Sequence, residues 1–211
     1  MPLTQDLNGK SLKEAQASAA AYKHSWYQKH EERFEGLKEG QAPTILLISC
    51  SDSRIMPGLI TDAKPGDIFG IQNAGNIIPA YGDDSIGYAA TLEYAVRVLG
   101  VKDIIVCGHE SCGAMGALLT PQNITPFFQI QTWLEHAPRA KDIVKYSTQK
   151  ETLARLVEQN TLHQIENIKS YPWVQEKVEK GELKLHAWVH HFSTGQTDQY
   201  IPEKDKFVPI N

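Results

Sequence analysis

The sequence has no long apolar run, no excess of positive charge and few cysteines. No stretch approaches the ~20 apolar residues of a membrane-spanning helix, and residues 1–6 lack the basic start and apolar core of a secretory signal. The 21 Lys and Arg residues against 25 Asp and Glu residues give a mildly acidic surface, which favours neither nucleic acid nor a membrane as a partner. We therefore expect a cytoplasmic protein that acts on a small molecule.

The cysteines are three, an odd number and too few for a disulfide framework, which indicates a reducing compartment. Cys107 ends an apolar Ile-Ile-Val run and is predicted to be an inert, buried thiol, because free cysteine is among the most buried residue types. Cys50 and Cys112 stand instead beside other reactive side chains. These two cysteines are the starting point for a candidate site.

Two short apolar runs lead directly into these cysteines. Residues 44–49 precede Cys50, and residues 103–107 precede His109 and Cys112; each run is typical of a parallel strand buried on both faces. The carboxyl ends of such strands share one edge of a sheet, and positions i and i+3 converge on one helical turn. Two thiols and an imidazole suit one tetrahedral zinc ion per chain with an open position.

Asp52 and Arg54 follow the first cysteine closely and can form a bidentate ion pair. Taken alone, each cysteine or histidine is more often a buried side chain than a ligand, and a surface Asp–Arg pair contributes little stability. A cysteine phosphatase is disfavoured, because it would need an arginine six residues after Cys50, where the chain has Met56. The grouping of the polar residues favours a metal site over these alternatives.

The pattern C-x-D-x-R, followed downstream by H-x-x-C-G, resembles the signature of the β-class carbonic anhydrases. The resemblance continues through residues 64–69, 73–76 and 93–96 and ends at 193–195, so that it covers most of residues 31–195. It implies that zinc is held by Cys50, His109 and Cys112. It also implies that Asp52 and Arg54 form the catalytic pair.

The same resemblance implies reversible hydration of carbon dioxide to bicarbonate and a proton, with zinc-bound hydroxide as the nucleophile. Phe69, Ala74 and Tyr94 match positions that line the apolar substrate pocket, partly from across a dimer interface. The backbone N–H of Gly113 would donate to the negative oxygens that develop in the product. The implied assembly is a homodimer or a dimer of dimers.

Two other functions are compatible with these residues. A hydrolase of carbonyl sulfide or carbon disulfide with the same fold would need the same hydroxide and would differ only in access to the site. A non-catalytic, zinc-stabilised binding module would use the same three ligands. The binding module would leave the Asp52–Arg54 pair without a purpose.

Some positions depart from the family. One branch closes its site by letting the aspartate bind zinc, with a bicarbonate pocket built from a Trp and an Arg where this chain has Leu47 and Gln72. Without a guanidinium to pair with the anion, we expect the site to rest with Asp52 on Arg54. Residues 190–192, His-His-Phe, also replace the acidic and aliphatic residues expected before Thr-Gly.

The length suits a single domain, 1–211, with an N-terminal helical arm at 1–40 and an α/β core at 41–211. The resemblance implies a central, mainly parallel β-sheet of four parallel strands plus an edge strand, flanked by helices. Ser11 and Glu14 predict a capping box, and Ser85 a helix cap. Helices are predicted over 11–39, 85–99, from 112 to 121, 127–137, 152–168 and 172–181, and strands over 44–49, 67–71, 103–107 and 183–192, the last at the sheet edge.

Overall fold

The computed structural model describes residues 9–82, 86–138 and 146–211. The predicted cap Ser85 lies outside these described residues. The chain divides into two compact units, residues 1–41 and 42–211. None of the described helices is long and apolar enough to cross a bilayer.

The N-terminal unit contains three short helical segments where one helix was predicted. They are α1 (Leu12–Ser25), the 3-10 helix η1 (Tyr27–His30) and α2 (Glu31–Leu37). The capping box of Ser11 and Glu14 is confirmed. The helix breaks at Trp26, whose carbonyl oxygen lies 2.8 Å from the ring nitrogen Nδ1 of His30, and the two rings stack with centroids 4.0 Å apart. The side chain of His30 thus takes up a carbonyl that a continuous helix would use.

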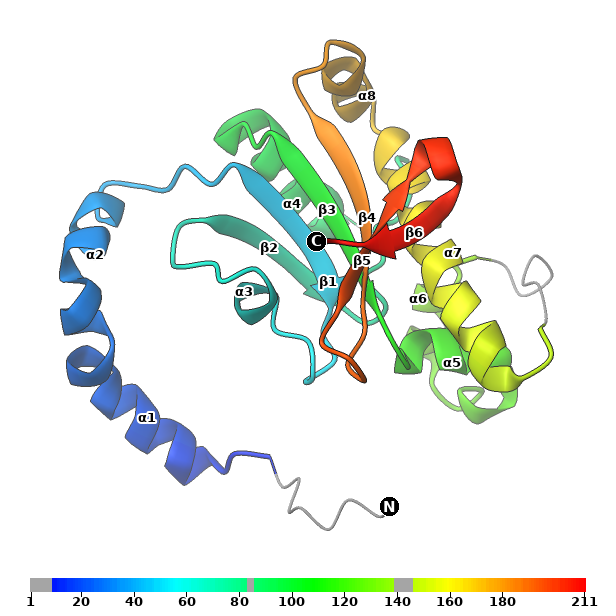
Figure 1. Cartoon of the computed structure of the whole chain (residues 1–211), viewed down its shortest axis with the longest axis horizontal. Helices are drawn as coiled ribbons and strands as arrows, with labels where there is room; N and C mark the ends of the chain where they lie inside the picture. The colour runs from blue at the N-terminus through cyan, green and yellow to red at the C-terminus, as the bar shows by residue number, and fades with distance from the viewer. Residues whose placement is uncertain (1–8, 83–85, 139–145) are drawn as a thin grey trace. The chain divides into compact units, whose positions relative to one another are not determined.

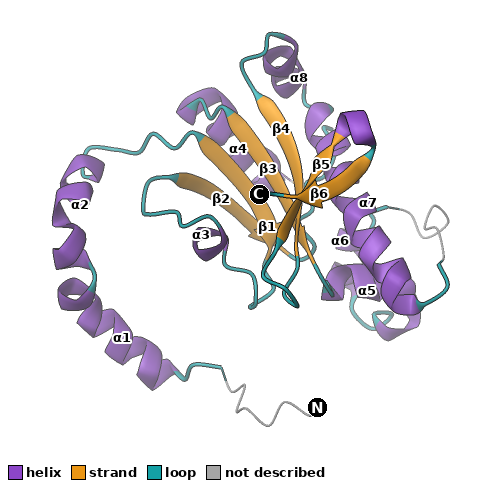
Figure 2. Ribbon diagram, in the orientation of Figure 1, coloured by secondary structure: helices purple, strands orange, loops and turns teal. Residues whose placement is uncertain are grey.

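The second unit is built on one six-stranded sheet in the order β2-β1-β3-β4-β5-β6, drawn as orange arrows in Figure 2. The first four strands are parallel and the last two antiparallel, which confirms the predicted mainly parallel α/β fold. The strands are β1 (Ile45–Cys50), β2 (Ile68–Asn73), β3 (Asp103–His109), β4 (Lys184–His190), β5 (Thr197–Ile201) and β6 (Lys206–Pro209).

The prediction that residues 183–192 form the edge strand is wrong. The strand of this segment, β4, lies inside the sheet, because β3 pairs with it on one side and β5 on the other. Two antiparallel strands, β5 and β6, follow β4 in the chain, and neither was predicted from the sequence. All five residues of β5 are half-buried, so its apolar pattern is weak.

Helices cover both faces of the sheet (Figure 1). Along β1, Leu46 and Ile48 pack into one apolar cluster with α4, η2 and α8, whereas Leu47 packs into a second cluster with α5 and α6. The long helix α7 contributes to both clusters. The helices are α3 (Pro57–Ile60), α4 (Ile86–Glu93), the π-helix η2 (Tyr94–Leu99), α5 (Gly113–Leu119), η3 (Pro121–Asn123), α6 (Phe128–Leu134), α7 (Gln149–Lys169), α8 (Pro172–Glu179) and η5 (Pro202–Lys204).

Helix α7 approaches β3 closely at Gly108, the residue before the end of that strand. A Cβ atom at Gly108 would lie 2.5 Å from Thr161 Oγ1 and 3.0 Å from Val157 Cγ1. Glycine is therefore required for this contact. The close contact fixes the carboxyl end of β3 against a long, well-packed helix.

Candidate metal centre

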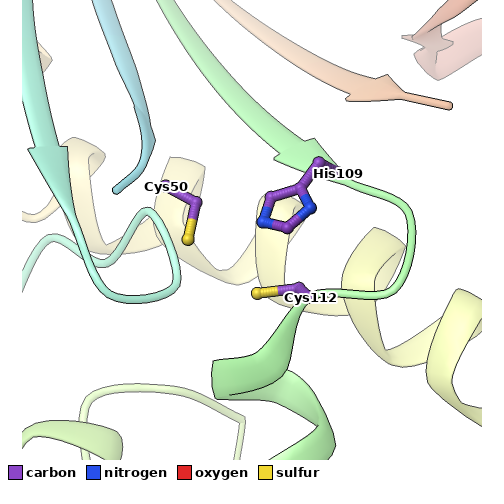
Figure 3. A group of neighbouring side chains, drawn as sticks. All are labelled: Cys50, His109 and Cys112. Carbon is purple, nitrogen blue, oxygen red and sulfur yellow. The ribbon is translucent and has the colours of Figure 1, made fainter. Parts of the chain in front are cut away.

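Three buried side chains from separate elements meet at one end of the parallel strands. Cys50 is the last residue of β1, His109 is the last residue of β3, and Cys112 directly precedes α5. Their donor atoms lie within 4.8 Å of one another, and Figure 3 shows the two sulfur atoms and the imidazole converging. Since β1 and β3 are parallel neighbours, their carboxyl ends bring the first two residues together.

His109 is oriented by its own loop. Its Nδ1 lies 2.9 Å from the carbonyl oxygen of Glu110, which can only accept, so Nδ1 carries the hydrogen. Its Nε2 is buried and has no hydrogen-bond partner among the described residues. A buried polar atom without a partner is costly, and a metal ion would satisfy it.

The two thiols form a coupled pair with opposite pKa shifts. The hydrogen bond from the neighbouring Cys112 thiol lowers the pKa of Cys50, because it stabilises the Cys50 thiolate. The bond to Cys50, together with burial, raises the pKa of Cys112. Thiolate sulfur and neutral imidazole are the donors that zinc prefers, so these three residues fit a zinc ion.

The turn after β2 supports Cys50. The backbone N–H of Gly75 donates to Cys50 Sγ over 3.4 Å. Asn73 closes this turn on itself, because its side chain bonds both the N–H and the carbonyl of Ile77 at 2.7 Å. Asn160 of α7 donates to the Gly75 carbonyl at 3.0 Å. The sequence analysis included residues 73–76 in the family resemblance but did not predict their contact with the thiol.

Asp52 and Arg54 form the expected bidentate ion pair. Arg54 Nε donates to Asp52 Oδ1 at 2.8 Å, and Nη2 donates to Oδ2 at 2.7 Å. The hydrogen-bonded guanidinium lowers the pKa of Asp52 to about 2, so the carboxyl is ionised at neutral pH. Asp52 Oδ2 lies 3.9 Å from His109 Nε2. An ionised carboxylate therefore stands beside the three candidate ligands.

Two further residues contact Arg54, and neither was predicted from the sequence to belong to the site. Ser111, whose φ of 55° is left-handed, accepts a hydrogen bond from Arg54 Nη2 at 3.2 Å through its carbonyl. The ring centroid of Phe192 lies 4.7 Å from Arg54 Cζ. The sequence did single out Phe192 in one respect, because residues 190–192 depart from the family pattern before Thr-Gly.

The predicted pocket residues do not all gather at the three ligands within this chain. Ala74 directly precedes Gly75, and Gly113 begins α5. Phe69 contacts Tyr94 at a centroid distance of 5.9 Å, but it packs with the apolar cluster on the opposite side of the sheet from Cys50. Phe69 and Tyr94 therefore do not line a pocket with Cys50 inside one chain.

Cys107 lies on β3 and is 2 % exposed. Burial raises the pKa of its thiol to about 12, so it stays protonated and unreactive at neutral pH. The structure thus places this cysteine in the core, as predicted. It is not part of the group formed by Cys50, His109 and Cys112.

Fold and site together define an α/β protein with a candidate Cys–His–Cys metal centre. The family model described as "Carbonic anhydrase" matches residues 45–197. A carbonic anhydrase of Pseudomonas aeruginosa is 40% identical over 187 residues, covering 87% of this chain and 85% of the relative. A carbonic anhydrase of Helicobacter pylori strain J99 is 35% identical, covering 93% and 94%.

Solved structures agree with these matches. The β-carbonic anhydrase CcaA superimposes with a TM-score of 0.88 at 33% identity, covering 96% of this chain and 93% of that one. A tetrameric β-carbonic anhydrase of Sordaria macrospora gives a TM-score of 0.72 at 27% identity, covering 88% and 94%. The chain belongs to the β class of the carbonic anhydrase family. The members of this class are zinc-dependent lyases.

Proposed function

We propose that this protein is a carbonate dehydratase that interconverts carbon dioxide with bicarbonate and a proton, using one zinc ion per chain. The observation that carries the proposal concerns the buried Nε2 of His109, which has no hydrogen-bond partner in the part of the chain that the structure describes. This atom lies beside two thiols and 3.9 Å from the ionised carboxylate of Asp52. Cys50, His109 and Cys112 would hold the metal. Bound zinc would lower the pKa of a coordinated water toward ~7, which supplies hydroxide at neutral pH.

Asp52 would act as a hydrogen-bond acceptor for the nucleophile. Its carboxylate stays ionised because Arg54 bonds both of its oxygens. Beside a bound metal, this carboxylate would accept a hydrogen bond from the nucleophile that the metal supplies and would orient it toward the substrate. Arg54 would hold the carboxylate in place and keep it from binding the metal, because it occupies both carboxylate oxygens.

Gly113 supplies a donor for the product. It is the first residue of α5 and directly follows Cys112, so its backbone N–H lies near the three ligands. Negative charge develops on the substrate oxygens as bicarbonate forms, and a fixed N–H stabilises that charge. Carbon dioxide itself is apolar and requires an apolar wall to bind.

We propose that a second copy of the chain supplies part of this wall. Phe69 and Tyr94 lie on the opposite side of the sheet from Cys50, and Tyr94 is 43% exposed. These residues could line the site of a neighbouring copy, with Ala74 contributed next to Cys50. A homodimer, or a dimer of dimers, would therefore be the active form.

The thiol ligands also suggest where the protein works. All three cysteines are free, and thiols that must bind metal are preserved by a reducing compartment. The mildly acidic composition favours neither nucleic acid nor a membrane as a partner. We propose a cytoplasmic location, which localisation of the tagged, full-length chain would test.

A stopped-flow assay on protein of known zinc content tests the reaction. We expect rapid hydration of carbon dioxide and slow or no hydrolysis of carbonyl sulfide and carbon disulfide. The reverse preference would make the protein a sulfur-substrate hydrolase with the same site. No turnover of any of the three at full zinc occupancy would leave a zinc-stabilised binding module and refute the enzyme.

A mixing experiment tests whether copies share a site. Cys50→Ser removes a ligand, and Tyr94→Ala removes a pocket wall, so each variant alone should be weakly active. If Tyr94 serves the neighbouring site, a mixed dimer contains one site with all its residues intact. Activity regained on mixing and refolding supports the shared pocket, whereas activity equal to the average of the two variants contradicts it.

A further inference from the structure

The turn after β4 places an aromatic ring against the catalytic pair. The Phe192 centroid lies 4.7 Å from Arg54 Cζ, within the ~6 Å over which a guanidinium is attracted to a ring face. The same ring lies 5.2 Å from the imidazole of His109, inclined by 49°. One side chain therefore contacts both a candidate metal ligand and the arginine that holds Asp52.

Arg54 needs such a contact. Its side chain is 51% exposed, so water competes for its hydrogen bonds to Asp52 and to the Ser111 carbonyl. The ring adds an attraction to the guanidinium that does not use the N–H groups. Phe192 thus restricts the rotation of Arg54 while leaving its donors to the carboxylate.

The backbone around Phe192 is tied to the loop that carries His109. The N–H of Glu110 donates to the His190 carbonyl at 2.8 Å, and the Glu110 carboxylate accepts from the Ser193 N–H at 2.9 Å. These bonds flank Phe192 on both sides in sequence. Since Glu110 directly follows His109, the ring and the ligand loop are held in one arrangement.

We propose that Phe192 is a positioning residue for the Asp52–Arg54 pair. The ring holds the guanidinium against the carboxylate, and the carboxylate is thereby kept on arginine, 3.9 Å from His109 Nε2, where it can accept a hydrogen bond. This role rests on the proposed function, because it acts through Asp52. Phe192 itself touches no reacting atom.

Three substitutions separate this role from simple packing. Phe192→Leu removes the ring face, and Phe192→Tyr keeps it. Phe207→Leu makes the same deletion at a half-buried ring on β6, which is tilted by 55° against the ring of Tyr200 with the centroids 5.4 Å apart. We expect Phe192→Leu to lower kcat/KM by about tenfold with zinc content unchanged, as for loss of one cation–π contact. Phe192→Tyr should restore the rate, and Phe207→Leu should retain it.

A readout independent of turnover uses the Arg54 Nε–H group. Its hydrogen exchange with solvent is measured by NMR on zinc-loaded protein, with the signal identified by its loss in Arg54→Lys. We expect exchange several-fold faster in Phe192→Leu than in native protein, Phe192→Tyr or Phe207→Leu. If carbon dioxide turnover is absent altogether, this exchange still decides whether Phe192 positions Arg54.

The outcomes that overturn the proposal are equally specific. Native-like exchange and turnover in Phe192→Leu would remove the positioning role. An equal loss in Phe207→Leu would reduce the effect to general packing. If Phe192→Leu does not fold, Phe192→Met takes its place with the same expectations, because the flexible methionine side chain can adapt to the space of the ring without supplying a ring face.

Discussion

Gly75 donates its backbone N–H to the thiol of Cys50 over 3.4 Å, although 25 positions separate the two residues in the chain. Gly75 has a φ of 85°, which residues with a side chain rarely adopt. A Cβ atom there would lie 3.1 Å from Met115 Cε and 3.2 Å from Ala114 Cβ. The contact with the thiol therefore depends on the absence of a side chain.

Gly75→Ala is expected to lower the free energy of unfolding by about 1–3 kcal/mol, through backbone strain and crowding, and to weaken zinc binding. Gly116→Ala is the matched control, because a Cβ on Gly116 of α5 meets no atom within 4 Å. Urea unfolding and competition with a zinc chelator measure the two effects. Equal stability of both variants would contradict the strained position.

Loss of a ligand should remove the metal. We expect Cys50→Ser, His109→Ala and Cys112→Ser each to lose most of the bound zinc, because a site rarely survives the loss of one ligand in three. Cys107→Ser is the control, since Cys107 lies outside the cluster. Elemental analysis of the purified variants decides the matter: near-stoichiometric zinc in the three ligand variants would refute the assignment.

Loss of the catalytic pair should spare the metal. Asp52→Asn and Arg54→Ala are expected to lower kcat by roughly 10²–10⁴-fold, the usual range for a positioned proton acceptor. Zinc content should stay at the native level, because neither residue is a ligand. Ser53→Ala, an exposed neighbour, should keep full turnover. Unchanged turnover in Asp52→Asn would return the pair to an ordinary surface ion pair.

Bicarbonate should not inhibit the enzyme cooperatively. Leu47 and Gln72 occupy the positions at which one branch of the family builds a bicarbonate pocket, and the neutral amide of Gln72 donates to the Cys50 carbonyl at 3.2 Å. No guanidinium stands there to pair with a buried anion. Initial rates measured over a bicarbonate series should give simple product inhibition. A sigmoidal response would contradict this expectation.

His163 should add to the acid sensitivity of the fold. Burial lowers the pKa of His163, so the unfolded chain binds this proton more readily than the folded one. The contribution to stability is present above the unfolded pKa, ~6.5, and is lost as pH falls toward the folded value. His163→Gln should therefore flatten the unfolding free energy against pH below ~6.5. If the unfolding free energy of His163→Gln depends on pH in the same way as that of the native protein, His163 does not contribute to the acid sensitivity.

The buried parallel strands could be predicted from the sequence because their residues are apolar on both faces. Strands β1 and β3 appear as continuous runs, and each ends at a ligand, so Cys50 and His109 could be placed at one edge. Strands β5 and β6 were missed because neither is fully buried at any position. Because β5 and β6 were not predicted, β4 was wrongly predicted to be the edge strand.

Contacts that depend on three-dimensional packing were also beyond the sequence. The break at Trp26 depends on the ring of His30, and nothing in the local pattern shows it. The contact of Phe192 with Arg54 joins two loops that are distant in the chain. The candidate ligands could be predicted because each belongs to a short local motif at the end of a strand, whereas their supporting residues could not.

The side chains beneath the turn after β2 affect how the protein opens. The amide of Ile78 donates to the Gln164 side chain at 2.9 Å, and Ile77, Ile78 and Gln164 are completely buried. Amide groups of this kind exchange their hydrogens only when the surrounding core separates, so this turn belongs to the last part of the protein to unfold. The Cys50 side of the candidate metal centre is therefore supported by a part of the structure that opens rarely.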